Sequence, residues 1–134
     1  MATVTNILNQ QTARGSVTTW HSLWDSTTQL TDSVVVDLSA QSDGKTNNLK
    51  LDKIWYQCTA GIQFTLEFDD DSSDEFIHTS VLGHTTPVEV DYTDNGRLPG
   101  LSRASSGGTS DIQLTSISAA SGDEIMLIVW YVAS

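Results

Sequence analysis

The sequence predicts an all-β protein, a single antiparallel β-sandwich of jelly-roll type with an extended N-terminal arm. Apolar residues recur at every second position in short runs, the spacing of strands that bury one face. Clusters of Gly, Ser, Asn and Asp separate these runs, as turns between antiparallel strands require. No segment shows the periodicity of an amphipathic helix. Short strands at this spacing are typical of sandwiches, among which jelly rolls are common.

Five runs alternate most clearly, namely 33–38, 62–68, 87–92, 111–117 and 124–132. Weaker strands are expected at 17–24, 49–58 and 75–82. Turns are expected between them, at 42–48, 59–61, 93–100, 105–110 and 121–123. The alternation also predicts which side chains enter the core, including Val34, Val36 and Leu38 in the first run and Ile62, Phe64, Leu66 and Phe68 in the second.

Within 49–58 the apolar phase shifts between Leu51 and Ile54. An extra residue in one strand of an antiparallel pair produces such a shift. We therefore expect a β-bulge near Asp52 and Lys53.

Residues 1–15 are rich in Thr, Asn and Gln and have few apolar anchors, so they cannot bury enough surface to order alone. We interpret them as an arm preceding a domain of residues 16–134. Val4, Ile7 and Leu8 offer contacts through which the arm could order against a neighbouring subunit. A frayed terminus is the alternative.

The C-terminal strand is apolar on both faces. One face carries Ile125, Leu127, Val129 and Tyr131, and the other carries Met126, Ile128, Trp130 and Val132. A sandwich strand normally needs only one apolar face, and a charge-free edge strand invites aggregation. Either the strand is central with its outer face covered by the arm or a loop, or the second face is a subunit interface. We expect the interface.

Composition excludes several functions. The chain has 134 residues, 17 acids against 6 bases and a formal charge of −11, which argues against binding of nucleic-acid phosphates. The longest apolar run, 125–133, is about half of the roughly 20 residues that a membrane helix needs, and no secretory signal opens the chain. We expect a soluble protein that contacts neither nucleic acid nor membrane.

The stretch FDDDSSDEF (68–76) is the strongest candidate for a local site. A loose cation loop could use Asp69, Asp71 and Asp74, but Asp74 stands where an EF-hand needs Gly, and no distal Glu follows. We prefer an acidic, solvated turn whose most plausible contact is a partner's basic residues. The flanking Phe68 and Phe76 then end one core strand and begin the next.

No catalytic, metal-binding or cofactor-binding pattern emerges elsewhere. Cys58 is alone in an apolar run, and His21, His78 and His84 lack the paired-His spacing of a cupin metal site. There is no nucleophile elbow, carboxylate pair or phosphate loop, so we expect a non-enzyme without cofactors. A carbohydrate-binding module is one alternative, because Trp20 and Trp24 lie on the same side of a strand and Trp55 and Tyr56 add further aromatic faces.

Four segments carry a resemblance to a known group: GSVTTWHSLWD, KIWYQCTAGIQFTLEFD, GRLPGLSRASSGGTSDIQLTS and SGDEIMLIVWYVAS. Together with the polar arm, they resemble small β-sandwich virion structural proteins of tailed bacteriophages, of the capsid cement or decoration type. The shared features are a strand ending in a TAG turn, an apolar strand closing on an acidic residue, and a last strand opened by SGD.

This resemblance implies a protein that binds the outside of an icosahedral shell, often as a trimer, and bridges capsomers. Its partners would be further copies of itself and the major capsid protein or other virion proteins. Its location would be the capsid surface, after synthesis in the host cytoplasm. A head–tail joining protein or a tail or fibre-base protein is the alternative within the same group.

Overall fold

The computed structural model describes residues 2–12, 15–38, 49–69, 75–80, 85–93, 98–99 and 111–133. These residues form strands, turns and no α-helix, so no helix among them could cross a membrane. The strands in chain order are β1 (Ala2–Thr12), β2 (Gly15–Trp24), β3 (Ser33–Val36), β4 (Leu49–Cys58), β5 (Gln63–Phe68), β6 (Glu75–Thr79), β7 (Val88–Asp91), β8 (Leu98–Pro99), β9 (Ile112–Ile117) and β10 (Glu124–Ala133).

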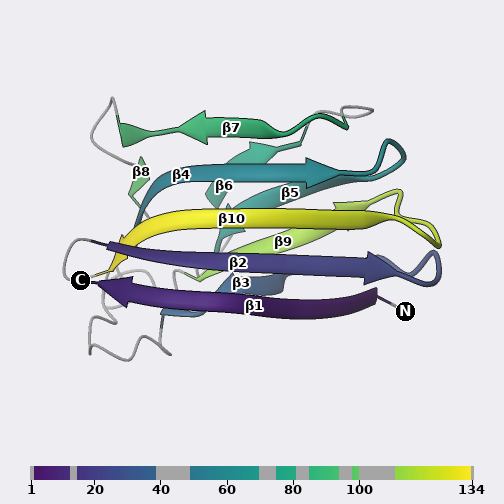
Figure 1. Ribbon diagram of the computed structural model, residues 1–134, viewed down its shortest axis with the longest axis horizontal. Coiled ribbons are helices and arrows are strands. Elements are labelled where there is room, and N and C mark those ends of the chain that lie inside the picture. Colours follow the sequence, from purple (N-terminus) through teal and green to yellow (C-terminus); the bar gives the residue numbers. More distant parts are fainter. Residues whose placement is uncertain are drawn as a thin grey trace.

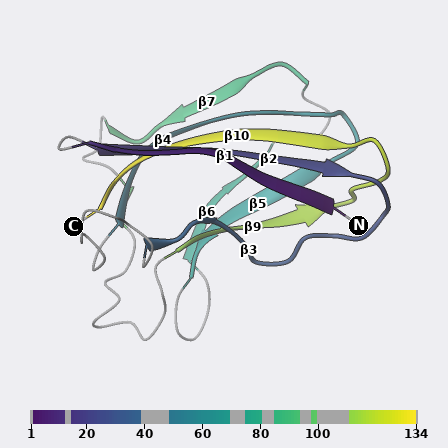
Figure 2. The ribbon, with the colours of Figure 1, turned by 60° about the horizontal axis from the view of Figure 1, so that its bottom comes forward.

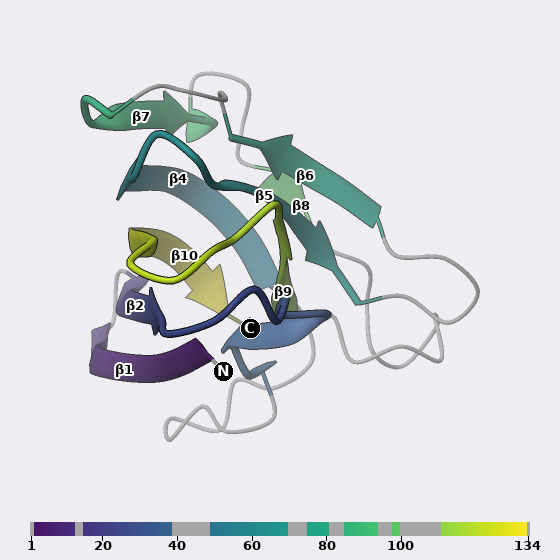
Figure 3. The same ribbon diagram turned by 90° about the vertical axis from the view of Figure 1, so that its right-hand side faces the viewer.

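The strands form two antiparallel sheets that pack face to face (Figures 1 and 3). The larger sheet has the order β1-β2-β10-β4-β7, with β8 also paired to β4, and the smaller sheet has the order β3-β9-β5-β6. Figure 2 shows the chain crossing repeatedly between the layers. The interleaved orders β2-β10-β4-β7 and β3-β9-β5-β6 are those of a jelly roll. The predicted fold class is therefore confirmed.

The core lies between the sheets and follows the predicted alternation. Ile62 and the inward residues of β5 are at most 1% exposed, and the inward residues of β10 are 0% exposed. Tyr56 of β4 and Phe64 of β5 join the two sheets by an edge-to-face contact, with ring centroids 5.0 Å apart. Val88, Val90 and Tyr92 pack against this core from the β7 side.

The predicted bulge is present in β4. Trp130 of β10 pairs with Lys53, and the next residue, Tyr131, pairs with Leu51, so Asp52 is the extra residue of the bulge. The carbonyl of Asp52 instead accepts a hydrogen bond from the Tyr92 amide at 2.8 Å. The extra residue keeps both Leu51 and Ile54 buried and directs Lys53 outward.

The prediction for β3 was wrong in one detail. Val34 is 45% exposed, whereas Val35 and Val36 are each 2% exposed. Val34 pairs with Gln113 and Val36 pairs with Ile112, so Val35 is an extra residue in this ladder. The irregularity reverses the phase of the alternation, which a single strand cannot reveal.

The N-terminal segment is extended, as predicted, but it is joined to the sheet of its own chain. Ala2–Thr12 forms β1 and pairs with β2 from Ala2 opposite Trp24 to Thr12 opposite Gly15, with an irregularity between Asn6 and Leu8. A polar segment gains order here through backbone pairing, which needs no apolar anchor. The side chains of Val4, Ile7 and Leu8 lie outside the described residues, so their docking to a neighbour stays a prediction.

A second short segment also pairs where a turn was expected. Leu98–Pro99, within the predicted turn 93–100, forms β8 against Lys50 and Leu51 of β4.

Candidate functional site

The outward face of the larger sheet carries the most distinctive surface among the described residues. β10 lies between β2 and β4, so its edges are satisfied by pairing. Its residues alternate, with Ile125, Leu127, Val129 and Tyr131 at 0% exposure and Met126, Ile128, Trp130 and Val132 partly exposed. The two-faced character of this strand is confirmed, and the strand is central in the sheet, a position that the sequence had offered as one of two alternatives.

The register shows what surrounds these outward residues. Ile128 lies opposite Thr19 on β2 and Trp55 on β4. Trp130 lies opposite Val17 on one side and Lys53 on the other. We call the outward apolar residues of these three strands the apolar stripe; they are Val17, Leu23, Trp55, Met126, Ile128, Trp130 and Val132.

β1 leaves the stripe uncovered. It extends the larger sheet beyond β2, so it lies beside that strand rather than across β10 (Figures 1 and 3). Of the covers that the sequence left open, the arm of the same chain is thereby excluded for residues 2–12. A covering loop stays untested, because the loops 39–48, 70–74, 81–84, 94–97 and 100–110 lie outside the described residues. The role of Met126, Ile128, Trp130 and Val132 as a subunit interface stays a prediction.

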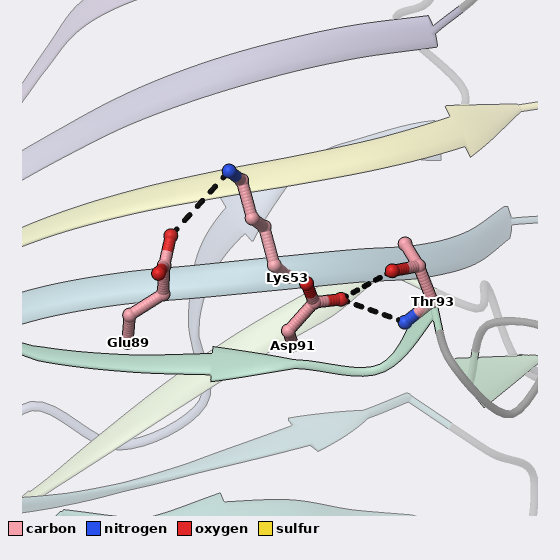
Figure 4. A network of polar contacts seen from close by, with 4 residues as sticks. All are labelled: Lys53, Glu89, Asp91 and Thr93. Atoms are coloured by element: carbon pink, nitrogen blue, oxygen red, sulfur yellow. Dashed lines mark hydrogen bonds and ion pairs between the residues drawn. The ribbon is translucent and has the colours of Figure 1, made fainter.

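A small charged cluster borders the stripe (Figure 4). The Lys53 ammonium lies 4.6 Å from the centroid of the Trp130 ring and 3.4 Å from a carboxylate oxygen of Glu89 on β7. The neighbouring Asp91 carboxylate accepts hydrogen bonds from the hydroxyl and the amide of Thr93. These bonds, more than the charge of Lys53, hold the pKa of Asp91 below its usual value.

A pocket of about 550 Å³ opens at the end of the same face where β10 begins. We call it the Trp55 pocket; it is lined by Trp55, Gln57, Cys58, Thr59, Ala60, Thr85, Glu124 and Met126. Trp55 and Met126 belong to both the pocket and the apolar stripe. The sequence reasoning missed this pocket as a site, although the phase of β4, with Ile54 and Tyr56 inward, already turned Trp55 outward.

Hydrogen bonds fix the positions of residues that line the Trp55 pocket. Gln57 Nε2 donates to the carbonyl of Thr85 at 3.1 Å, which ties β4 to the segment before β7. The Thr59 hydroxyl donates to Asp123 Oδ1 at 2.7 Å and accepts from the Glu124 amide at 3.2 Å. At the rim, Glu124 Oε1 lies 3.4 Å from Nε2 of His21, and the Glu124 side chain is 48% exposed.

The acidic stretch 68–76 is only partly described. The Asp69 amide donates to the carbonyl of Asp111 at 2.9 Å, which joins the end of β5 to the start of β9. Asp71 and Asp74 lie outside the described residues, so the cation loop stays untested. Within the described ranges, no group of three His, Cys, Asp or Glu side chains could hold a metal ion.

Phe68 and Phe76 differ in their surroundings. Phe68 is 1% exposed and ends a core strand, as predicted, but Phe76 is 61% exposed. The β5–β6 ladder has an irregularity between Leu66 and Glu67, which sets Phe76 opposite the outward Glu67 and turns Ile77 inward. The reading of Phe76 as a core residue was therefore wrong.

The predicted sugar platform is not available on β2. Trp20 and Trp24 do share one side of the strand, but it is the inward side, where they are 0% and 1% exposed. Trp24 Nε1 is further occupied by the carbonyl of Thr28 at 3.0 Å. Tyr56 is also fully buried, which leaves Trp55 as the partly exposed member of the four aromatics.

The cysteine and the histidines do not form a reactive site among the described residues. Cys58 is 5% exposed, and burial, followed by the charge of Asp123, raises the pKa of its thiol, which keeps it protonated. His78 points inward, with its Nε2 3.0 Å from the Tyr56 hydroxyl, and burial lowers its pKa. His21 lies on the outward face of β2, and His84 lies outside the described residues.

Comparison with known proteins adds no family. No family model matches this sequence, and no curated protein matches it. Among solved structures, the chain is similar to Drosophila melanogaster CENP-C bound to CAL1, with 8% identity and a TM-score of 0.33 over 92% of this chain and 78% of that chain. A cupin superfamily protein from Desulfitobacterium hafniense is similar with 9% identity and a TM-score of 0.33, over 98% and 78% of the two chains. At such low TM-scores these likenesses carry no argument about this chain.

Proposed function

We propose that this chain is a non-enzymatic structural protein of a tailed-phage virion, most closely a capsid cement protein. It would form a homotrimer, bind the outside of the icosahedral shell and bridge neighbouring capsomers. The observation that carries the proposal is the apolar stripe on the outward face of a central strand. The resemblance of four long segments to small β-sandwich virion proteins supplies the class of particle.

The stripe calls for a face-to-face partner. Contiguous apolar surface of this kind marks interaction sites on soluble proteins. Because β10 is paired on both edges, strand addition cannot cover its outward residues, whereas a flat face of another subunit can. The contacts assigned to self-association are Met126, Ile128, Trp130 and Val132. Met126 lines the Trp55 pocket and Ile128 lies opposite Trp55, whereas Trp130 and Val132 lie further along β10 from the pocket.

The smaller sheet shows the contrast. Its two central strands, β9 and β5, present mostly polar side chains outward, which are Gln63, Thr65, Glu67, Gln113 and Thr115. Exposed apolar residues occur at its margins, on β3, on β6 and at the end of β9. A protein with one polar face and one apolar face is suited to a surface layer, in which one side contacts protein and the other contacts water.

Mass action explains how such a protein would work. A ligand that binds the assembled lattice and not its free subunits stabilises the lattice by its binding free energy at every site. Joining three copies would raise the avidity, because contacts that are weak alone act together once one of them has formed.

Native mass spectrometry of the full chain at micromolar concentration tests the self-association, and a trimer is expected. Co-sedimentation with phage shells that lack this protein tests the cement role. Shells that bind the protein should withstand heating to a higher temperature than bare shells. A monomer that also leaves the shells unbound would refute the proposed function.

A further inference from the structure

The Trp55 pocket is a preformed concavity whose walls do not depend on a ligand. Gln57 is tied to Thr85, and the turn after β4 is tied to the turn before β10 through Thr59 and Asp123. The Gln57–Thr85 bond uses the amide nitrogen of Gln57, which leaves its side-chain oxygen as an acceptor. A ligand would therefore meet a site whose side chains are already placed, which lowers the entropic cost of binding.

The chemistry of the lining is aromatic, apolar and acidic. Trp55 and Met126 supply an indole ring and a thioether, and Glu124 is the charged residue among those that line the pocket. The nearest described cation on the same strand, Lys53, is engaged with Trp130 and Glu89. His21 Nε2 lies 3.4 Å from one carboxylate oxygen of Glu124, and nearly half of the Glu124 side chain is open to solvent.

We infer that the Trp55 pocket receives a basic side chain, an arginine, from a protein partner. A guanidinium group is planar, stacks on indole rings and pairs with a carboxylate through two parallel hydrogen bonds. Trp55 and Glu124 provide these two contacts within one concavity, and the Gln57 oxygen adds an acceptor. The formal charge of −11 on the whole chain favours approach of a cationic partner.

This inference deepens the proposed function and rests on it for the identity of the partner, another virion protein. A cement protein needs an attachment to the shell besides its contacts with its own copies. The pocket adjoins Ile128, which lies opposite Trp55, whereas Trp130 and Val132 lie further along β10. Arginine recognition there would leave Trp130 and Val132 free to pack against other subunits.

The test is a titration of the full-length, isotope-labelled protein followed by NMR. The probe is Nα-acetyl-L-arginine amide, and its matched control is the citrulline analogue, which has nearly the same shape and no charge. We expect saturable shifts of the Trp55 indole and the Met126 methyl signals, with a Kd on the order of millimolar for so small a ligand. The citrulline analogue should bind at least about tenfold more weakly.

Two variants locate the effect. Glu124→Gln should weaken binding of the arginine probe by at least about tenfold. Glu67→Gln, which removes the same charge from the outward face of the smaller sheet, should leave binding unchanged. Equal binding of arginine and citrulline, or unchanged binding by Glu124→Gln, would overturn the inference. Saturation of the same signals by methyl glucoside or N-acetylglucosamine at lower concentration would also overturn it, in favour of a glycan site.

Failure of the arginine inference can be distinguished from failure of the proposed function. The trimer mass and the shell binding of the same samples are measured independently of the probe. If the wild-type protein is trimeric and binds shells but no signal of the pocket responds to arginine, the inference fails and the proposed function stands. If Glu124→Gln remains trimeric but loses both the probe and the shell, the pocket is the attachment to the shell.

Discussion

The ammonium group of Lys53 lies 4.6 Å from the centre of the Trp130 ring, on the outward face of the larger sheet. The bulge at Asp52 allows Lys53 to point outward while Leu51 and Ile54 both stay in the core. Lys53 lies between Trp130 and Glu89, and it gives the margin of the apolar stripe a positive charge. Figure 4 shows its ion pair with Glu89.

We predict that Lys53→Ala modestly lowers the free energy of unfolding. The substitution removes a cation–π contact and an ion pair that are both partly exposed, so the free energy of unfolding should fall by about 0.5–1 kcal/mol. Urea unfolding followed by tryptophan fluorescence measures it. Lys50→Ala, an exposed lysine on the same strand, is the control, and an equal effect of both substitutions would show that the Trp130 contact adds nothing.

Two phenylalanines offer a comparison of core and surface. Phe64 is fully buried against Tyr56, so Phe64→Ala should cost about 3–5 kcal/mol. Phe76 is 61% exposed, so Phe76→Ala should change stability by no more than about 0.5 kcal/mol. Thermal and urea unfolding of both variants give the comparison. Similar losses for the two would contradict the register derived for β5 and β6.

His78 should make stability depend on pH. Burial lowers its pKa in the folded protein below the usual 6.5, so the folded state binds protons less readily than the unfolded state. The free energy of unfolding should therefore be highest above 6.5 and should fall as the pH drops toward the folded pKa. His78→Gln, which keeps a polar partner for the Tyr56 hydroxyl, should flatten this dependence. The measurement is urea unfolding between neutral and mildly acidic pH, and an identical slope in both proteins would exclude His78 as its source.

The sequence predicted correctly those features that depend on the pattern of apolar residues within a single strand. The alternation in 62–68 and 124–132 and the phase shift at Asp52 each follow from residues that are neighbours along the chain. Val34 and Phe76 were misplaced because their orientations depend on irregular pairing with another strand. The residue pattern of one strand does not show where its pairing with a neighbouring strand becomes irregular.

The Trp55 pocket escaped sequence reasoning for a related reason. Its lining comes from β4 and the turn after it, from β10 and from the segment before β7, and the jelly-roll order of the larger sheet brings these parts together. The N-terminal strand was missed because its order comes from backbone pairing with β2, and backbone pairing leaves little trace in a Thr- and Asn-rich sequence.

Ile128→Arg should separate self-association from folding. Ile128 lies outward on the central strand between Thr19 and Trp55, so a long charged side chain there can reach water in a monomer. In a trimer that packs through the stripe, the same charge would be buried without a partner, and association should weaken by at least about 30-fold. Thr115→Arg, on the outward face of the smaller sheet, is the matched control and should stay trimeric. Native mass spectrometry gives the assembly state and circular dichroism confirms the fold. A trimer that survives Ile128→Arg and dissociates with Thr115→Arg would move the interface to the smaller sheet, because only a buried position cannot accommodate the added charge.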